Sequence, residues 1–317
     1  MAPDGERGAR LRPARRALGG VPLHRPAERH VRRGGETLPG RDRRRAAALR
    51  RLGRTGHDEG HRCRAARIPG ASLGEGLSVA APYVFGVIPA RGGSKGLPGK
   101  NLRRLGALSL IGHAIASARE ATRLTRFVVS TDSDAIAEEA RRHGAEVPFL
   151  RPAELASDEA GMIPVLQHAV RWLESTGARP DLIVTLQPTS PFRVGADIDR
   201  TIARAAETGA DSAQTLSEAS YHPYFMKTLD GDVTHALFEE GYRYVRRQDA
   251  PAVYQPSGAV YVTRYDVLMG QGRVLGKDNR GIVMDFAASV NIDTEWDFLL
   301  AELVLGQGRA PIPPSRR

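Results

Sequence analysis

The chain has 317 residues, of which 41% are hydrophobic and 26% charged, and its formal net charge is +10. That length allows one large domain or two small ones with a sizeable core. No apolar run approaches eighteen residues and no signal-peptide pattern is present, so neither a membrane span nor secretion is indicated. The single cysteine, Cys63, excludes a disulfide within the chain and a cysteine metal site, and the expected location is the cytoplasm.

The positive charge is concentrated in residues 1–80. This leader has 19 arginines, no lysine and 8 acidic residues, whereas residues 81–317 are close to neutral. It lacks sustained apolar periodicity, so we expect it to be disordered, as we expect of the tail at 309–317. Three interpretations of the leader remain open: an arginine-rich arm that binds nucleic acid, a transit peptide, against which its acidic residues argue, and GC-rich DNA translated upstream of a start near Val79.

A glycine-rich, basic loop follows the first apolar run after the leader. Residues 83–88 have the length and composition of a strand buried on both faces. Residues 90–101 then contain four glycines and the cations Arg91, Lys95 and Lys100. Because glycine lets backbone N–H groups approach an anion closely, the loop predicts a triphosphate site. A basic surface loop is the plainer alternative, since the spacing matches neither the P-loop nor the dinucleotide fingerprint.

From residue 108 onward the sequence alternates between helical and strand patterns. We expect helices at 108–122, 133–143, 161–176 and 198–208, and strands at 126–131, 147–150, 181–186 and 212–216. This alternation predicts an α/β fold, a Rossmann-like three-layer α/β/α sandwich with a mostly parallel sheet, in one domain at 81–308.

Polar runs occur where ligands of such sheets bind, beyond the carboxyl ends of the strands. They are residues 130–132 and 187–191, although Ser130 and Asp132 are equally compatible with helix capping. Near the end of the domain, alternation along an expected strand places Asn291 and Asp293 on one face. Their oxygens suit a hard cation, and the carboxylate of Asp293 is the stronger candidate.

The loop after the first strand resembles the signature of the sugar-acid cytidylyltransferases, Ala-Arg-x-x-Ser-Lys-Gly-x-x-x-Lys-Asn, which spans residues 90–101 here. Its Lys-Asn ending resembles the CMP-sialic acid synthetases, a family that includes enzymes for legionaminic and pseudaminic acids. The Kdo-activating branch usually reads Lys-Pro at that point. The segments 151–158 and 186–191 are also similar to that family. The resemblance covers roughly Val84 to Leu305 and implies the nucleotide-diphospho-sugar transferase type of fold.

The resemblance also implies roles for individual residues. Implied contacts to CTP are Ala90, Arg91, Gly92, Ser94, Lys95, Lys100, Asn101 and Ser157. Implied contacts to the sugar acid are Gln187, Lys227, Arg247, Ser257 and Tyr261, with Ser257 standing where relatives usually have asparagine. Residues 217–255 would form a small inserted subdomain through which the protein dimerises. Asp293 would hold Mg²⁺, with Asn291 in place of the family's first aspartate, which removes one negative charge.

These features predict a nucleotidyltransferase that activates a sialic-acid-like nonulosonic acid with CTP and releases pyrophosphate. Arg91, Lys95, Lys100 and Asp293 are the residues expected to act on the reacting phosphates. One alternative is a cytidylyltransferase for Kdo or another sugar acid. Another is a non-catalytic protein that binds nucleotide or nucleic acid, against which the near-neutral body argues. The expected partners are CTP, a small acidic sugar and a second copy of the chain, but no membrane.

Overall fold

A six-stranded sheet forms the centre of the protein in the computed structural model, which describes residues 81–94, 96–157 and 159–308. Its strand order is β10 (Asn279–Val283), β6 (Ser212–Glu218), β9 (Tyr254–Arg264), β5 (Leu182–Thr185), β1 (Val84–Pro89) and β4 (Arg126–Ser130). Strand β1 is parallel to β4 and β5, and β10 is parallel to β6. Only β9 runs antiparallel to its neighbours β5 and β6 among these strands. The sheet is therefore mostly parallel, as predicted.

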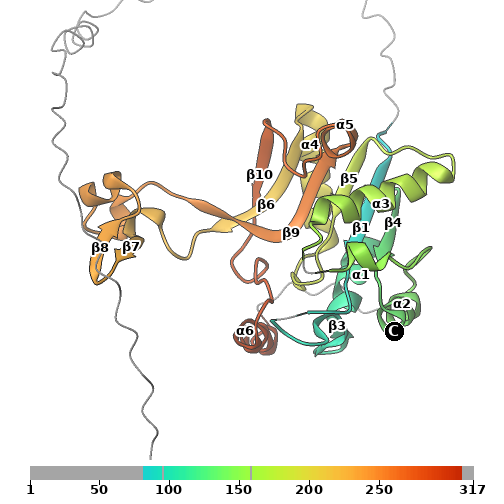
Figure 1. Cartoon of the computed structure of the whole chain (residues 1–317), viewed down its shortest axis with the longest axis horizontal. Coiled ribbons are helices and arrows are strands. Elements are labelled where there is room, and N and C mark those ends of the chain that lie inside the picture. Colours follow the sequence, from blue (N-terminus) through green and yellow to red (C-terminus); the bar gives the residue numbers. More distant parts are fainter. Residues whose placement is uncertain (1–80, 95, 158, 309–317) are drawn as a thin grey trace, which may run out of the picture. The chain divides into compact units, whose positions relative to one another are not determined.

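Helices cover both faces of this sheet (Figure 1). On one face, α1 (Leu110–Glu120), α2 (Asp134–Arg142) and α4 (Gly195–Thr208) contribute to one apolar core. On the other, α3 (Met162–Ser175) and the short α5 (Tyr265–Met269) form a second core with β1, β4 and β5. The central strands are buried because each faces a helix layer on both sides. This arrangement confirms the three-layer α/β/α sandwich.

A third apolar core lies beside the main sandwich. It joins the paired strands β2 (Arg104–Leu105) and β3 (Leu108–Ser109) to the last helix, α6 (Glu295–Gly306). Thr294 caps α6 by accepting a hydrogen bond from the Asp297 backbone, and the Asp297 carboxylate accepts one from the Thr294 backbone in return. This reciprocal cap fixes the start of α6 and, with it, the segment that carries Asp293.

An arm of residues 219–253 is inserted between β6 and β9 (Figure 1). It contains the hairpin β7 (Lys227–Asp230) and β8 (Val233–Ala236), which turns at Gly231, and 3₁₀ turns at Pro223–Phe225, Glu239–Arg243 and Arg247–Asp249. A hydrogen bond of 3.0 Å from the Ala219 N–H to the Val253 carbonyl closes its base. Most described arm residues are exposed, including every residue of the two hairpin strands except Ala236.

Two expected strands are absent from the described residues. The segment at 147–150 does not form a strand. Two isolated bridges lie at its ends, between Glu146 and Val128 and between Leu150 and Thr131, because Pro148 between them has no N–H to donate. The segment around Asn291 is a loop, although the expected alternation holds, since Val290 and Ile292 are buried in the third core. Strand β10 and the hairpin β7–β8 were not predicted.

The predictions for the leader 1–80, the tail 309–317, Lys95 and Asp158 lie outside the described residues. The described part belongs to one compact unit, Glu75–Arg317. Within that part, the helices are too short or too polar to cross a lipid bilayer.

Candidate active site

A cleft of about 600 Å³ opens beyond the carboxyl ends of β1 and β5. It collects segments that lie far apart in the sequence. Its walls include Arg91, Ser94, Gly96, Lys100 and Asn101 from the loop after β1, Arg151 and Ser157, Gln187, Pro188 and Thr189 after β5, and Asp293 and Thr294 before α6. The cleft therefore lies where ligands of parallel sheets bind.

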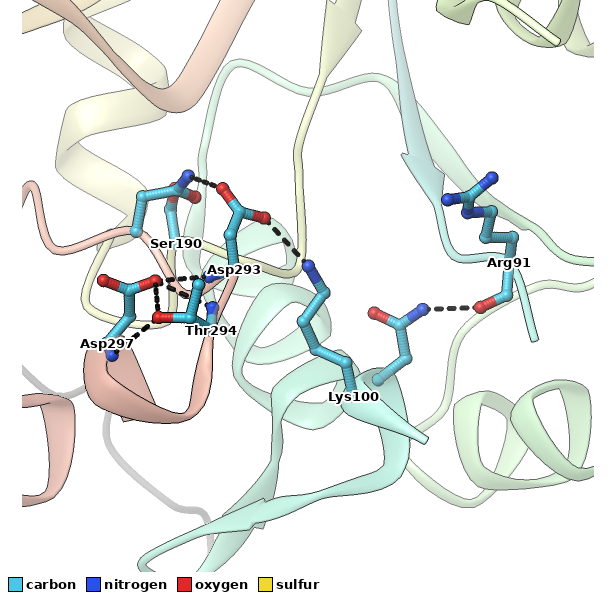
Figure 2. A network of polar contacts seen from close by, with 8 residues as sticks. Arg91, Lys100, Ser190, Asp293, Thr294 and Asp297 are labelled. Atoms are coloured by element: carbon cyan, nitrogen blue, oxygen red, sulfur yellow. Dashed lines mark hydrogen bonds and ion pairs between the residues drawn. The ribbon is translucent and has the colours of Figure 1, made fainter. Parts of the chain in front are cut away.

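The basic loop after β1 is held in place by polar contacts at both ends. The Gly92 N–H donates to the Asp132 carboxylate at 2.9 Å, and the Asn101 amide donates to the Arg91 carbonyl at 2.9 Å (Figure 2). Ala90 is fully buried and is not among the described residues that line the cleft. Asp132 therefore anchors the loop, while Ser133 caps α2 through the Ile136 N–H. Asp132 thus does not cap α2, nor does it line the cleft in the part of the chain that the structure describes.

Arg91 extends from this loop across the cleft. Its Nη1 donates to the Ser157 carbonyl at 3.3 Å, so Ser157 meets the loop through its backbone. Both residues line the cleft together with Ser94. The structure thus brings most of the predicted nucleotide contacts into one site.

Lys100 and Asp293 form an ion pair in the cleft. The Lys100 Nζ lies 2.9 Å from Asp293 Oδ1, and the Asn291 amide donates to Asp293 Oδ2 at 2.9 Å (Figure 2). The Asp293 side chain is nevertheless 63% exposed. Gly96 passes so close that an added Cβ would lie 2.5 Å from the Asp293 carbonyl oxygen. The loop after β1 and the segment before α6 are therefore fitted to each other, and only glycine allows this approach at position 96.

The oxygen atoms here are those that a hard cation prefers, but they are few. In the described part of the chain, no group of three or more His, Cys, Asp or Glu side chains is placed to hold a metal ion. Asn291 turns its amide nitrogen to Asp293 and its oxygen to the Ser190 hydroxyl, 3.4 Å away. Mg²⁺ in phosphate-transfer sites is commonly held by one or two carboxylates plus substrate phosphates. The exposed Asp293 carboxylate fits that requirement, with Asn291 orienting it.

Arg151 is a cleft residue that sequence reasoning did not single out. It is buried, and it donates to both the hydroxyl and the carbonyl oxygen of Ser130. Burial lowers the pKa of its guanidinium. The Asp132 carboxylate partly offsets this effect by raising the pKa, whereas the neighbouring Arg91 charge lowers it further. One signal was available in the sequence, because Arg151 directly follows the apolar residues 147–150. From the segment 151–158, only Ser157 was predicted to contact the nucleotide.

The predicted sugar contacts lie in two places. Gln187 lines the cleft, and Tyr261 is half-buried on β9, where burial raises the pKa of its hydroxyl. Ser257 is only 3% exposed, and its hydroxyl donates to the Thr215 hydroxyl at 2.7 Å.

Lys227 and Arg247 belong to the arm. The Lys227 Nζ lies 5.1 Å from the centre of the Tyr242 ring, and Arg247 donates to the Ala219 carbonyl at 2.7 Å. Neither arm residue lines the cleft of its own chain as described.

Comparison with known proteins identifies the family. The family described as Cytidylyltransferase matches residues 85–293, which span the sheet, the basic loop and Asp293. The chain belongs to the cytidylyltransferase family. This enzyme is 33% identical over 221 residues to the post-translational flagellin modification protein B of Campylobacter coli, covering 69% of the chain and 93% of that protein. It is also 33% identical over 219 residues to the CMP-N,N'-diacetyllegionaminic acid synthase of Campylobacter jejuni, with the same coverage.

A solved structure shows the same fold as this cytidylyltransferase. It is a CMP:2-keto-3-deoxy-manno-octonic acid synthetase in complex with CTP, with a TM-score of 0.54 and 17% sequence identity. The alignment covers 71% of the present chain and 99% of that chain. At this identity the likeness concerns the fold alone.

Proposed function

We propose that this cytidylyltransferase activates a nonulosonic acid of the sialic or legionaminic type, forming the CMP-sugar and pyrophosphate from CTP. The observation that carries the proposal is the continuity of the cleft. One wall bears Arg91 and Lys100, as a triphosphate needs, and another bears Gln187, which can hydrogen-bond a sugar. The named activity of the Campylobacter jejuni relative supports this class of acid.

The cations of the loop after β1 would hold the triphosphate. Arg91 offers a planar fork to two phosphate oxygens, and Lys100 offers a compact charge beside Asp293. Lys95, which belongs to the same run, is assigned to the phosphates on the sequence alone. Ser94, Asn101 and Ser157 line the same wall. Gly92 is assigned to the nucleotide on the sequence alone, because its N–H donates to Asp132. This distribution supports a phosphate position between Arg91 and Asp293.

The chemistry requires positioning and charge stabilisation more than a reactive side chain. The anomeric hydroxyl of the acid would attack the α-phosphorus in line, and pyrophosphate would leave toward Lys100. A magnesium ion held at Asp293 would supply neutralisation of the phosphate charge. Asn291 and Lys100 would orient the Asp293 carboxylate from its two sides. The two substrates would meet between Lys100 and Gln187.

The acid would need cations of its own, because Arg91 and Lys100 of the cleft are assigned here to the triphosphate. We infer that the protein is a homodimer in which the arm of one copy reaches the cleft of the other with Lys227 and Arg247. The arm supports this inference because it exposes large apolar side chains, among them Leu229 at 72%, Tyr242 at 70% and Val245 at 93%. A two-stranded hairpin with both faces exposed is marginally stable alone. Burial against a second copy would cover these side chains.

The test is pyrophosphate release by the full chain with Mg²⁺, each of the four nucleoside triphosphates, and a panel of acids. The panel contains N-acetylneuraminic acid, a legionaminic-type acid, a pseudaminic-type acid and Kdo. We expect release with CTP and a nine-carbon acid. Release with Kdo alone would show that Kdo is the acceptor, while the reaction would still be a cytidylyl transfer from CTP. A folded protein that binds CTP but releases no pyrophosphate with any acid would contradict the proposal.

A further inference from the structure

The guanidinium of Arg193 lies fully inside the protein. Arg193 ends the loop between β5 and α4, and only 1% of it is exposed. Its Nε donates to the Ser117 hydroxyl of α1 at 3.1 Å. Its Nη1 donates to two backbone carbonyls, those of Gln187 at 3.1 Å and Ala259 at 2.6 Å. One side chain therefore joins α1, the loop after β5 and strand β9.

The two carbonyls belong to residues that the sheet would otherwise pair with each other through N–H···O=C bonds. Strands β5 and β9 are antiparallel, with Leu182 opposite Arg264 and Thr185 opposite Tyr261. Continuing this register places Gln187 opposite Ala259. The Tyr265 N–H donates to the Asp181 carbonyl, so alternate pairs from that point exchange hydrogen bonds, and Gln187 with Ala259 would be such a pair. Arg193 is inserted where the next ladder bonds would form.

The insertion coincides with a second irregularity of β9. Gln214 of β6 pairs with Tyr261, whereas Leu216 pairs with Pro256, so residues 257–260 stand opposite Thr215 alone. The Ala259 N–H, released from the ladder, is 3.3 Å from the Ser257 hydroxyl. Both edges of β9 thus depart from regular pairing at the level of Gln187. The strands are held apart there by side chains rather than joined by their backbones.

The result is a fixed site for the Gln187 side chain. Gly258 has a φ of 78°, and a Cβ added to it would lie 3.4 to 3.5 Å from Asn291 Oδ1, Gln187 Oε1 and Ser190 Oγ. The amide of Gln187 therefore reaches the same place as Asn291, which holds Asp293. Its backbone carbonyl accepts from Arg193 at 3.1 Å and from the Ser190 N–H at 3.3 Å. Movement of that carbonyl would displace the Gln187 amide from the cleft.

Retaining an arginine here is costly, which argues for a positional role. Burial lowers the pKa of Arg193 to about 10, against the attraction of Asp197. Asp197 itself pairs with Arg200 at 2.6 Å, and Arg193 Nη2 has no hydrogen-bond partner in the described part of the chain. An apolar side chain would avoid the desolvation of a buried charge. It would not supply a rigid fork of donors to two carbonyls at once.

We propose that Arg193 is a positioning residue for the sugar-acid side of the cleft: it separates β5 from β9 and sets the Gln187 amide through the Gln187 carbonyl. This inference rests on the proposed function for its substrate but not for its geometry. Lysine at 193 would keep the charge and lose the fork. Arg200 lies in α4, where its exposed side chain pairs with Asp197, and it offers a matched control.

The first measurement is amide hydrogen exchange in the full chain, which requires no substrate. We expect Arg193→Lys to raise exchange of residues 186–193 about tenfold, while α3 and β1 keep their rates. Arg200→Lys should leave both regions unchanged. If exchange rose equally in all regions, Arg193 would act on global stability only, and the proposal would be overturned. Unchanged exchange of residues 186–193 in Arg193→Lys would also overturn it.

The second measurement is a double-mutant cycle with Gln187→Ala. We expect Arg193→Lys to raise KM for the acid about tenfold and to leave KM for CTP within about twofold. In the Gln187→Ala background, Arg193→Lys should add no further increase, because both changes remove one contact. If the two substitutions raised KM for the acid independently, so that their fold-changes multiplied in the double variant, Arg193 would not act through Gln187 and the proposal would be overturned. If the unaltered protein used no acid, the proposed function would fail, and the exchange measurement would still decide the role of Arg193.

Discussion

Lys100 Nζ lies 2.9 Å from Asp293 Oδ1, and this ion pair joins the loop after β1 to the segment before α6. The Lys100 side chain is 13% exposed, so its charge sits in a site with limited screening by water. The pair brings one of the three predicted phosphate ligands and the strongest predicted metal ligand to one point. A nucleotide entering the cleft would compete with Asp293 for Lys100.

Removing the Lys100 charge should therefore impair turnover more than folding. We expect Lys100→Met to lower kcat/KM for CTP by about 10²-fold, as is typical when one donor to developing charge is lost. The melting temperature should change little, because an ion pair with one exposed partner contributes little stability. Lys277→Met, at an exposed site away from the cleft, is the control. Steady-state kinetics with CTP as the varied substrate measures the effect, and equal activity of the two variants would refute the role.

Restoring a carboxylate at position 291 should change the magnesium dependence. In Asn291→Asp, the hydrogen bond from the Asn291 amide to Asp293 is replaced by two neighbouring negative charges. Such a pair binds a hard cation more strongly. We expect half-maximal activity at a Mg²⁺ concentration several-fold lower than in the unaltered enzyme. A magnesium titration at saturating CTP tests this, and identical curves would remove Asn291 from the metal site.

Gly258 offers a test of the sugar side with a closely matched control. Gly258→Ala places a Cβ on a residue with φ of 78°, within 3.4 to 3.5 Å of polar atoms of Gln187, Ser190 and Asn291. Gly272→Ala has a φ of 62° and nothing within 4 Å of the added Cβ. Both variants should lose about 1 to 2 kcal/mol of stability from the left-handed backbone. Only Gly258→Ala should raise KM for the acid, and an equal KM in both would contradict the placement of the acid beside Gln187.

His113 of α1 should make folding sensitive to acid. Burial lowers the pKa of its imidazole from 6.5, against the hydrogen bond to the Leu105 carbonyl, and the nearby His143 and Arg193 lower it further. The folded state therefore holds His113 neutral, while the unfolded chain takes up a proton near pH 6.5. The free energy of unfolding should fall as the pH drops below about 6.5, by at most about 1.4 kcal/mol per pH unit.

The measurement is chemical unfolding between pH 5 and 8 for the unaltered protein and His113→Gln. Glutamine can still donate to the Leu105 carbonyl but does not titrate. Its variant should show a flatter dependence on pH. Parallel curves would mean that other groups cause the acid sensitivity.

The proposed dimer predicts that charges on the arm will separate the two copies. Leu229→Asp and Val245→Asp place carboxylates on side chains that are 72% and 93% exposed in one chain. We expect each to shift the mass in sedimentation from dimer toward monomer and to reduce activity with the acid. Val283→Asp, at an exposed position of β10, should stay dimeric and active. A dimer unaffected by both arm changes would place the interface elsewhere.

Several elements could be predicted because their signals are local. The buried strand β1 and the glycines and cations after it follow directly from neighbouring residues, as does the helix expected at 133–143, which is α2. The strand expected at 147–150 was wrong because Pro148 interrupts the ladder, a local signal that was overlooked. Arg151 was missed for a different reason. Nothing next to it in the chain indicates that Ser130 and Asp132 surround it.

The sequence by itself determined the class of protein: apolar periodicity set the α/β alternation, and the spacing of glycines and cations in 90–101 indicated the family. Tertiary structure decided how the site is assembled. It placed Asp293 against Lys100 across 193 residues, turned the Asn291 amide toward Asp293, directed the Ser257 hydroxyl to Thr215, and inserted Arg193 between β5 and β9. Periodicity records only which face of an element is buried. Which distant groups meet there depends on strand order and register, and no short stretch of sequence contains them.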